Sequence, residues 1–366
     1  MINHRVLFVG GNFADLIRPS GYIAKMHACM KKFGLQVKFK NGGTFEELTL
    51  LLDDVVNYDV ILWFANVPND FDKIVSGIKT KNPHVILVTS KNNISNKYNY
   101  HEIAARMLSV KTNLCLVFTK NDSGIIEGTV IDPLLNGFTN KEPDVEAVTR
   151  AIVQRISKLL SYTRVGSIRG GDAIEVPDNN EFFEIARRYA EQFHNIIHQV
   201  NTERFLGNLS FRCESGFPSY RYGDTVFVSR RNIDKRMIGG SGFVGVSLSQ
   251  SKPIIYYGDA KPSVDTPVQV ALYNAYPKVN YMIHSHVYVT GAPFTNEKIP
   301  CGAFEEVMSI VNVLGYDIDN AAINLLGHGS IVFAKDLDYF NTIIYKPRPV
   351  LDFQYITKPI HANLLK

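Results

Sequence analysis

The sequence contains few cysteines, and none of them lies at the short spacing that metal-binding or redox motifs use. Two of them stand between apolar neighbours, which is typical of reduced, buried thiols in a cytosolic protein. We therefore expect no disulfide framework of the kind that stabilises small secreted domains. The four cysteines among the 366 residues are Cys29, Cys115, Cys213 and Cys301.

Long apolar runs and a marked excess of one charge are also absent. No stretch approaches the roughly 20 apolar residues that a membrane-spanning helix needs. The sequence opens on a strand-like segment, Val6–Val9, without a signal-peptide pattern. The 39 basic and 35 acidic residues give a net charge of +4, which is too small an excess to favour nucleic-acid binding. We expect a cytoplasmic protein without membrane or nucleic-acid partners, and an anionic small molecule is compatible with this charge.

The first 140 residues alternate between short apolar runs and stretches with helical periodicity. Strands that alternate with helices of this length are typical of βαβ units and a parallel sheet. We therefore predict an α/β fold that begins with a flavodoxin- or Rossmann-like doubly wound domain. The predicted strands are Arg5–Val9, Gln36–Phe39, Asp59–Phe64, His84–Thr89 and Leu114–Phe118. The predicted helices are Ser20–Phe33, Phe45–Val56, Phe71–Ile78 and Tyr100–Leu108.

A glycine pair, Gly10-Gly11, follows the first predicted strand. Such a pair lets the backbone approach a phosphate at a helix N-terminus, which would favour a nucleotide or flavin. The segment does not match the G-x-G-x-x-G dinucleotide motif, and a tight turn that needs glycine explains the pair equally well. The ligand and role of this domain therefore stay open.

A domain boundary is predicted where a helix, Asp144–Leu160, gives way to the glycine-rich polar segment Val165–Asp172. We accordingly divide the chain into residues 1–165 and 173–366. A long helix, about Asn179 to Val200, opens the second domain. Strands and helices follow it in mixed order, which indicates a layered domain of the α+β or α/β kind.

A candidate metal site lies in this second domain. His284 and His286 end an apolar stretch, and residues two apart on a strand point to the same face, so their imidazoles can lie side by side. His328 stands between two glycines in the apolar segment Asn324–Val332 and is the third candidate. Three protein ligands and one open position are typical of catalytic zinc. Histidines of the core or of a tight turn are the alternative interpretation.

Asp265 precedes His284 by nineteen residues and stands before a helical segment, Thr266–Ala275. A helix followed by a returning strand of this total length would bring the start of the helix towards the far end of the strand. Asp265 could therefore reach the metal site. It could equally serve as the N-cap of the helix, and the residues alone leave both roles open.

Several motifs in the second domain occur together and in a fixed order. They are Gly207-Asn208-Leu209-Ser210, Pro262–Pro267 with Asp265-Thr266-Pro267, His284-Ser285-His286, Ile299-Pro300-Cys301 and Leu325–Gly329. In this order they resemble the class II aldolase/adducin family, which includes zinc-dependent sugar-phosphate aldolases and ribulose-phosphate 4-epimerases. The resemblance covers roughly Asn179 to Leu351, and it does not extend to the N-terminal domain.

The resemblance implies a class II aldolase-like α/β/α domain that holds a divalent metal, with zinc the expected ion, on His284, His286 and His328. It implies that Asp265 moves a proton, and that the protein is a lyase of carbohydrate metabolism. Such a lyase would cleave a small phosphorylated or acidic sugar through an enediolate. It also implies a homo-oligomer, by analogy a tetramer. The residues expected to bind substrate are Asn208, Ser229, Arg230, Arg231 and Ser263.

The sequence also departs from the family pattern. Val264 replaces the second phosphate-site serine, and Val228–Asn232 replaces the family's phosphate loop. There Arg230 and Arg231 either hold an anion or form a solvated charged loop. The segment after His286 is short and lacks the family's acid/base residues, for which Glu305 and Glu306 are possible substitutes. They are otherwise expected at the start of a helix.

Three alternative functions follow from these departures and from the N-terminal domain. Asp265-Thr266-Pro267 favours a sugar-phosphate 4-epimerase, whereas the missing acid/base segment disfavours it. An adducin-like binding protein is the second alternative, although adducin-like members lack the metal histidines. A nucleotide- or flavin-dependent enzyme is the third.

Overall fold

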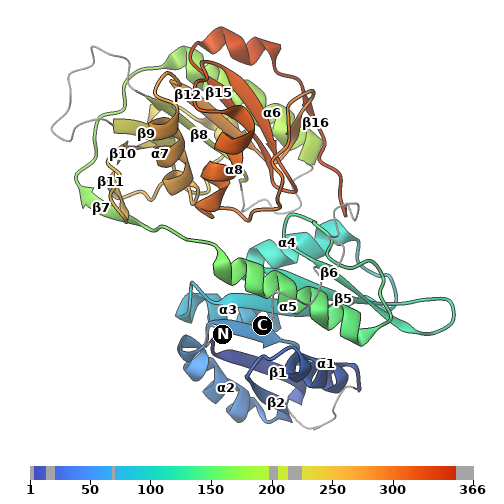
Figure 1. The fold of residues 1–366 in the computed structure, drawn as a ribbon. Helices are drawn as coiled ribbons and strands as arrows, with labels where there is room; N and C mark the ends of the chain where they lie inside the picture. Colours follow the sequence, from blue (N-terminus) through green and yellow to red (C-terminus); the bar gives the residue numbers. More distant parts are fainter. Residues whose placement is uncertain (1–3, 14–20, 68–70, 198–204, 213–224, 352–366) are drawn as a thin grey trace. The chain divides into compact units, whose positions relative to one another are not determined.

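The computed structural model describes residues 4–13, 21–67, 71–197, 205–212 and 225–351 and divides the chain into two compact units. Unit 1 comprises Met1–Ser161 and takes up the chain again from Pro349, and unit 2 comprises Tyr162–Arg348. Figure 1 shows the elements of each unit. The predicted ranges 1–165 and 173–366 differ from these units at both junctions. Cys213 lies outside the described residues.

Unit 1 is built on a six-stranded sheet with the strand order β2-β1-β3-β4-β5-β6. The first five strands pair in parallel, and β6 is antiparallel to β5. The order 2-1-3-4-5 is that of flavodoxin-like folds, so the predicted parallel sheet is confirmed, with β6 as an additional edge strand. The strands are β1 (Val6–Phe13), β2 (Val37–Gly43), β3 (Val60–Trp63), β4 (Ile86–Asn92), β5 (Leu114–Lys120) and β6 (Ile126–Ile131).

Helices cover both faces of this sheet, as expected for a doubly wound fold. Val6 and Phe8 of β1 pack with α1 and α5, whereas Leu7 and Val9 pack with α2 and α3 on the opposite face. Helix α4 covers Cys115 and Val117 of β5. The helices are α1 (Gly21–Lys32), α2 (Phe45–Asp54), α3 (Phe71–Lys81), α4 (Tyr100–Val110) and α5 (Val145–Ser161), and a short 3-10 helix, η1 (Val55–Asn57), follows α2.

The glycine pair lies inside β1 rather than in a loop after it. A Cβ on Gly11 would lie 2.5 Å from Oδ1 of Asn41 and 2.8 Å from the backbone nitrogen of Gly42. Gly11 also has a φ of 74°, which favours glycine. The pair therefore permits the close approach of β1 and β2, where the register shifts between Gly10 and Phe13.

Unit 2 contains an eight-stranded sheet with the order β14-β15-β12-β8-β9-β10-β11-β7. Its neighbouring strands are antiparallel except for β11 and β7. The glycine-rich segment Val165–Asp172, where the domain boundary is predicted, contains the edge strand β7. The strands are β7 (Ser167–Gly171), β8 (Asn208–Arg212), β9 (Thr225–Ser229), β10 (Phe243–Ser247), β11 (Ile254–Tyr257), β12 (Tyr281–Ser285), β14 (Ala321–Leu325) and β15 (Gly329–Ala334). A separate pair joins β13 (Tyr288–Val289) and β16 (Tyr345–Lys346).

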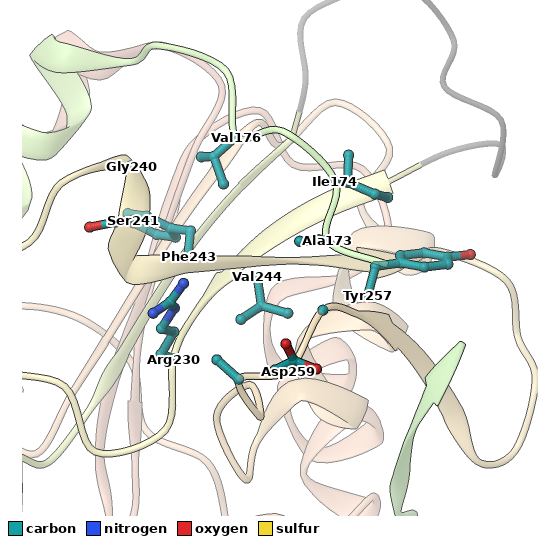
Figure 2. A pocket seen from close by; sticks show the side chains of 13 residues that line it. Ala173, Ile174, Val176, Arg230, Gly240, Ser241, Phe243, Val244, Tyr257 and Asp259 are labelled. Atoms are coloured by element: carbon teal, nitrogen blue, oxygen red, sulfur yellow. The ribbon is translucent and has the colours of Figure 1, made fainter. Parts of the chain in front are cut away.

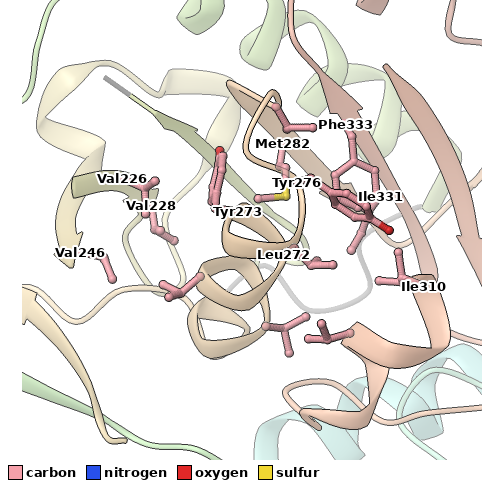
Figure 3. Close-up of a cluster of buried hydrophobic side chains, with 14 of the residues drawn as sticks. Val226, Val228, Val246, Leu272, Tyr273, Tyr276, Met282, Ile310, Ile331 and Phe333 are labelled. Atoms are coloured by element: carbon pink, nitrogen blue, oxygen red, sulfur yellow. The ribbon is translucent and has the colours of Figure 1, made fainter. Parts of the chain in front are cut away.

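Helices on both sides of the second sheet give unit 2 three layers. Helices α7 (Thr266–Ala275) and α8 (Glu305–Leu314) cover one face, where Leu272 and Ile310 pack near Phe333 (Figure 3). Helix α6 (Asn180–Ile197) covers the other face with Phe182 and Phe183. Burial of each large apolar side chain stabilises the fold by about 1.5–3 kcal/mol. The α/β/α fold expected of this domain is confirmed.

Short 3-10 helices complete unit 2: η2 (Lys235–Met237), η3 (Gly240–Gly242) and η4 (Leu337–Thr342). Among the helices of the described residues, none has the length and apolar character needed to cross a membrane.

Candidate metal centre

The three histidines come from two neighbouring parts of the second sheet. His284 lies on β12, His286 follows the last residue of β12, and His328 lies in the turn between β14 and β15. Because β12 pairs with β15, with Ser285 opposite Ser330, this turn is held against the end of β12. A Cβ on Gly329 would lie 1.9 Å from the Ser285 carbonyl oxygen. Only glycine therefore permits the approach that brings the three rings together.

The three imidazole rings face one another. Their centroids are 4.7 to 5.1 Å apart, and one possible ligand atom of each residue lies within 4.8 Å of the others. All three are buried, with exposed fractions of 4 % for His284, 8 % for His286 and 1 % for His328. Isolated histidines of the core would find individual partners, whereas these three converge on one point.

Hydrogen bonding leaves ring nitrogens available at this point. Nδ1 of His284 donates to the carbonyl oxygen of Ser330 at 2.9 Å, so the lone pair of His284 is on Nε2. Within the described part of the chain, Nε2 of His284 and Nδ1 of His286 are buried without a hydrogen-bond partner. A buried polar atom without a partner is costly, and a metal ion bound between the rings would satisfy both nitrogens. The donor set therefore fits a divalent metal such as zinc.

Electrostatics keep two of the rings neutral. Burial, followed by the charge of His328, lowers the pKa of His284 to about 4. Burial and the neighbouring histidines lower the pKa of His286 well below its ordinary value. A metal ligand must be a neutral imidazole with a free lone pair, and near neutral pH both residues meet this requirement.

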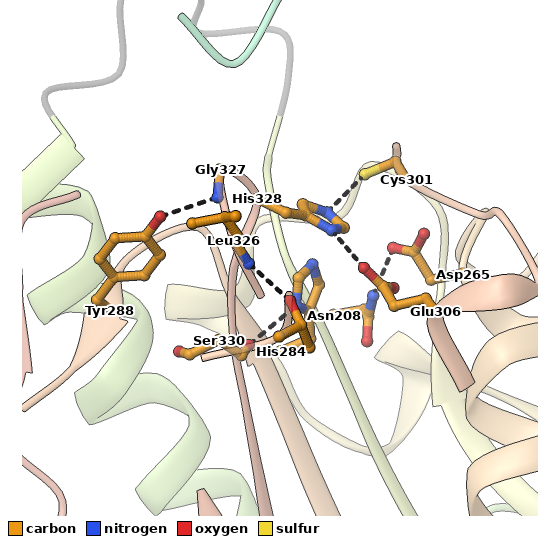
Figure 4. A network of polar contacts seen from close by, with 11 residues as sticks. Asn208, Asp265, His284, Tyr288, Cys301, Glu306, Leu326, Gly327, His328 and Ser330 are labelled. Atoms are coloured by element: carbon orange, nitrogen blue, oxygen red, sulfur yellow. Dashed lines mark hydrogen bonds and ion pairs between the residues drawn. The ribbon is translucent and has the colours of Figure 1, made fainter. Parts of the chain in front are cut away.

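His328 has a partner on each ring nitrogen (Figure 4). Nδ1 lies 2.9 Å from Oε1 of Glu306, and Nε2 lies 2.9 Å from Sγ of Cys301. Burial disfavours a proton on His328, but Cys301 and Glu306 outweigh it and hold the pKa of His328 well above its ordinary value. The same two neighbours that stabilise a proton on the His328 ring would also stabilise the positive charge of a metal ion next to it.

Asp265 is directed towards the histidines by side-chain contacts. It occupies the N-cap position of α7, but its side chain makes no capping hydrogen bond. Oδ2 instead accepts a hydrogen bond from Nδ2 of Asn208 at 2.9 Å, and Gln269 donates to Oδ1 of the same asparagine. Oδ1 of Asp265 is buried and, among the described residues, without a partner. The amide contact thus fixes one carboxylate oxygen and leaves the other one available.

A small cavity of about 10 Å³ is bordered by this carboxylate and, of the three histidines, by His284. Asp265, His284 and Glu306 all line it, together with Asn208 and Gln269. Such a volume holds about one water molecule. Two acidic side chains and one candidate ligand therefore border one small cavity, which Val268, Met282 and Ile331 also line.

The other residues expected to bind substrate are distributed around this site. Ser229 is fully buried, and its hydroxyl accepts a hydrogen bond from the backbone of Leu209 at 3.1 Å. The hydroxyl of Ser263 accepts one from the backbone nitrogen of Asp265 at 3.4 Å. Arg231 is exposed, and its Nε donates to the carbonyl oxygen of Pro262 at 3.3 Å. Ser263 thus contacts Asp265, whereas the Ser229 hydroxyl forms a hydrogen bond between the strands β8 and β9.

Arg230 faces a different space. It lines a cavity of about 300 Å³ with Phe243, Val244 and Asp259 (Figure 2). The described residues that line this cavity do not include the histidines. Arg230 and Arg231, which are adjacent in sequence, therefore have different surroundings.

The sequence alone did not indicate two residues that touch His328. Cys301 was expected to be an ordinary buried thiol, and Glu306 was expected either to substitute for a missing acid or to lie at a helix start. Glu306 does lie in the first turn of α8, but its side chain is buried against His328. Glu305, in contrast, accepts hydrogen bonds from the backbone nitrogen of Thr163. The only sequence signal was the proximity of both residues to the Ile299-Pro300-Cys301 motif.

Residues 187–311 match the family model described as the class II aldolase and adducin N-terminal domain. The match confirms, for these residues of unit 2, the resemblance to the class II aldolase/adducin family that the sequence motifs predicted. No curated protein matches the chain.

Several solved structures are similar to parts of the chain. A sugar-phosphate aldolase from Thermotoga maritima is 16 % identical and covers 44 % of this chain and 90 % of its own, with a TM-score of 0.32. L-fuculose 1-phosphate aldolase is also 16 % identical, with coverages of 44 % and 80 % and a TM-score of 0.32. The DNA/pantothenate metabolism flavoprotein from Streptococcus pneumoniae is 10 % identical, with coverages of 42 % and 99 % and a TM-score of 0.34.

Proposed function

We propose that this protein is a metal-dependent lyase of the aldolase type, which acts through an enediolate on a small phosphorylated or acidic sugar. One observation carries the proposal: three buried imidazoles converge, and two of them have a ring nitrogen without a partner among the described residues, beside a carboxylate whose Oδ1 is also unpartnered there. A binding protein of the adducin type would have no need of such a buried, unsatisfied polar cluster.

In this proposal His284, His286 and His328 hold one divalent ion, with zinc expected. When bound, the ion would act as a Lewis acid towards a carbonyl and its neighbouring hydroxyl. The Ser330 carbonyl orients the ring of His284, and Glu306 orients the ring of His328. Held rings can take up a metal ion without reorganisation, which favours tight binding.

Asp265 is the proposed group for proton transfer. Asn208 holds its Oδ2, so that Oδ1 can take a proton from a substrate hydroxyl or carbon and return it. The Ser263 hydroxyl contacts the backbone nitrogen of Asp265, and Arg231 contacts the carbonyl oxygen of Pro262. We propose Ser263 and Arg231 for the anionic end of the substrate. Charge pairing with a carboxylate or phosphate is the usual role of an exposed arginine at such a place.

The experiment that tests this function is metal analysis of the full-length protein, followed by a screen of phosphorylated ketoses for aldehyde products. We expect a stoichiometric divalent metal and cleavage of at least one ketose phosphate or acidic sugar. A metal-free protein that gains no metal on incubation with zinc would refute the site. A metal-loaded protein inert towards the whole panel would refute the lyase activity.

A sugar-phosphate 4-epimerase is the second candidate, because Asp265 and Glu306 line the same cavity. Two carboxylates at one site can divide proton removal and proton return between them. The same screen separates the two functions, since an epimerase yields an isomer and releases no aldehyde. A homo-oligomer is part of either proposal and is tested by light scattering.

A further inference from the structure

A row of buried polar side chains lies between α7 and β8 and ends at Asp265. Helix α7 and its N-cap residue present Asp265, Gln269 and Tyr273, which are four residues apart and therefore share one face of the helix. Strand β8 presents Asn208 and Ser210, whose two-residue spacing places them on one face of the strand. All five residues are at most 9 % exposed. Polar groups therefore replace apolar ones in this part of the contact between helix and sheet.

The carboxylate of Asp265 determines the orientation of the two amides in this row. A carboxylate only accepts hydrogen bonds, so the Asn208 atom that lies 2.9 Å from its Oδ2 must be the amide nitrogen, Nδ2 (Figure 4). Oδ1 of Asn208 then faces Gln269 and accepts a hydrogen bond from its Nε2. The reverse orientation of either amide would place two acceptors face to face, so each amide can take only one orientation.

Gln269 is held by the other end of the row. Its Nε2 also donates to Oγ of Ser210 at 3.2 Å, and the hydroxyl of Tyr273 lies 3.1 Å from the same oxygen. Both amide hydrogens of Gln269 therefore have acceptors, whereas its Oε1 is buried and without a partner among the described residues. Gln269 and Asp265 border the same small cavity. An unpaired buried acceptor is destabilising, and contacts that served only the packing of α7 on β8 would not require one beside this cavity.

We propose that Gln269 is a positioning residue for Asp265. Through Asn208 it holds one carboxylate oxygen, so that Oδ1 stays free to exchange a proton with the substrate. Without the donor of Gln269, the amide of Asn208 can rotate and present its own oxygen to the carboxylate, which then loses its hydrogen bond and turns away. The inference rests on the proposed function, because it concerns the proton transfer assigned to Asp265.

The test is a double-mutant cycle that measures turnover by the full-length, metal-loaded protein, with a phosphorylated ketose that the wild type cleaves in the screen. Gln269→Met keeps the length of the side chain and removes its donor. We expect kcat to fall by about tenfold or more, because Asp265 loses the hydrogen bond from Asn208 and hydrogen bonds to charged groups contribute about this factor. KM and metal content should change little, since neither the substrate's anionic end nor a histidine is altered.

Asn274→Leu is the matched control, because it removes another amide from α7. Nδ2 of Asn274 donates to the backbone carbonyl oxygens of Leu248 and Val270 and has no contact with Asn208 or Asp265 in the described structure. This variant should retain the kcat of the wild type.

Asp265→Asn completes the cycle. In this background Gln269→Met should lower kcat no further, because the group that Gln269 positions has already lost its ionisable form. Additive losses, or an unchanged kcat in Gln269→Met alone, would overturn the inference and limit the row to packing. If Gln269→Met fails to fold, Gln269→Glu takes its place, since it has the same shape with an acceptor instead of the donor. A wild type that cleaves no sugar of the screen would instead refute the proposed function, and the inference with it.

Discussion

Glu306 and His328 form a buried carboxylate–histidine pair, with Oε1 of the former 2.9 Å from Nδ1 of the latter. Their side chains are only 4 % and 1 % exposed. Burial raises the pKa of the Glu306 carboxyl, and the contact with His328 opposes that rise. Carboxylates that accept from the second nitrogen of a ligating histidine fix its orientation and increase its basicity. We therefore assign Glu306 the role of positioning His328.

Replacement of Glu306 tests this role. We expect Glu306→Gln to weaken metal binding by about 10–100-fold, because a neutral amide orients the ring without increasing its basicity. The neighbouring variant Glu305→Gln is the matched control, since Glu305 contacts the backbone of Thr163 instead. Zinc affinity is measured by chelator competition. Equal affinities for the two variants would contradict the role assigned to Glu306.

The histidine variants test the metal site directly. Wild type should copurify with about one divalent ion per chain, and His284→Ala or His286→Ala should each lose it, because two remaining imidazoles hold zinc poorly. His101→Ala, which changes an exposed histidine of α4, should keep the metal. Elemental analysis of the purified variants gives the answer. Full metal content in both site variants would place the ion elsewhere.

The variant Asp265→Asn distinguishes a role of Asp265 in proton transfer from a purely structural role. Asparagine keeps the size of the side chain and an oxygen that can accept from Asn208, so metal content and thermal stability should change little. Turnover of the substrate found by the screen should fall by roughly 10²-fold or more, the usual contribution of a positioned acid or base. Near wild-type turnover would assign Asp265 to structure and make Glu306 the next candidate for the proton.

The burial of the Lys235 ammonium group predicts that the free energy of unfolding depends on pH in the alkaline range. The residue is 6 % exposed, and its ammonium donates to the carbonyl oxygens of Phe205 and Ile233 at 3.3 Å each. Burial lowers the pKa of Lys235 to about 8, from 10.5 for an ordinary lysine. Below pH 8 both folded and unfolded chains carry the proton. Between pH 8 and 10.5 the unfolded chain binds more protons, so this residue's contribution to the unfolding free energy rises with pH.

Urea unfolding of the wild type and of Lys235→Met isolates this contribution. From pH 7 to pH 10.5 the difference in unfolding free energy should shift in favour of the wild type by up to about 3 kcal/mol. The comparison cancels titrations common to both proteins. A difference that stays constant or falls over this interval would show that the lysine is not buried in its charged form.

Periodicity in the sequence predicts most elements of the fold. The helix Thr266–Ala275 has the predicted bounds, and α8 begins at Glu305, where a helix start was expected, because each helix carries its own apolar face. The edge strands β6 and β7 were not predicted. Glycine and exposed polar residues interrupt their apolar pattern, and each gains its stability from one neighbouring strand. The strand order, in contrast, follows from long-range pairing that no local pattern contains.

In the candidate site, too, local sequence patterns do not reveal contacts between residues that are far apart in the chain. The two-residue spacing of His284 and His286, and the position of Asp265 relative to them, are visible in the sequence. The contacts of Glu306 and Cys301 with His328 span 22 and 27 residues. They depend on how α8 packs beside the turn between β14 and β15, so only the tertiary structure brings them together.

The pairing of β12 between β8 and β15 has a consequence for how the protein would acquire the proposed metal ion. The histidines on β12 meet His328 only after the chain has closed a loop of more than forty residues, and such loop closure is a slow, entropically costly event. A nascent or partly folded chain would therefore offer zinc at most two neighbouring imidazoles. The complete set of proposed ligands is a product of folding, so that metal capture would follow assembly of the sheet and could not guide its early steps.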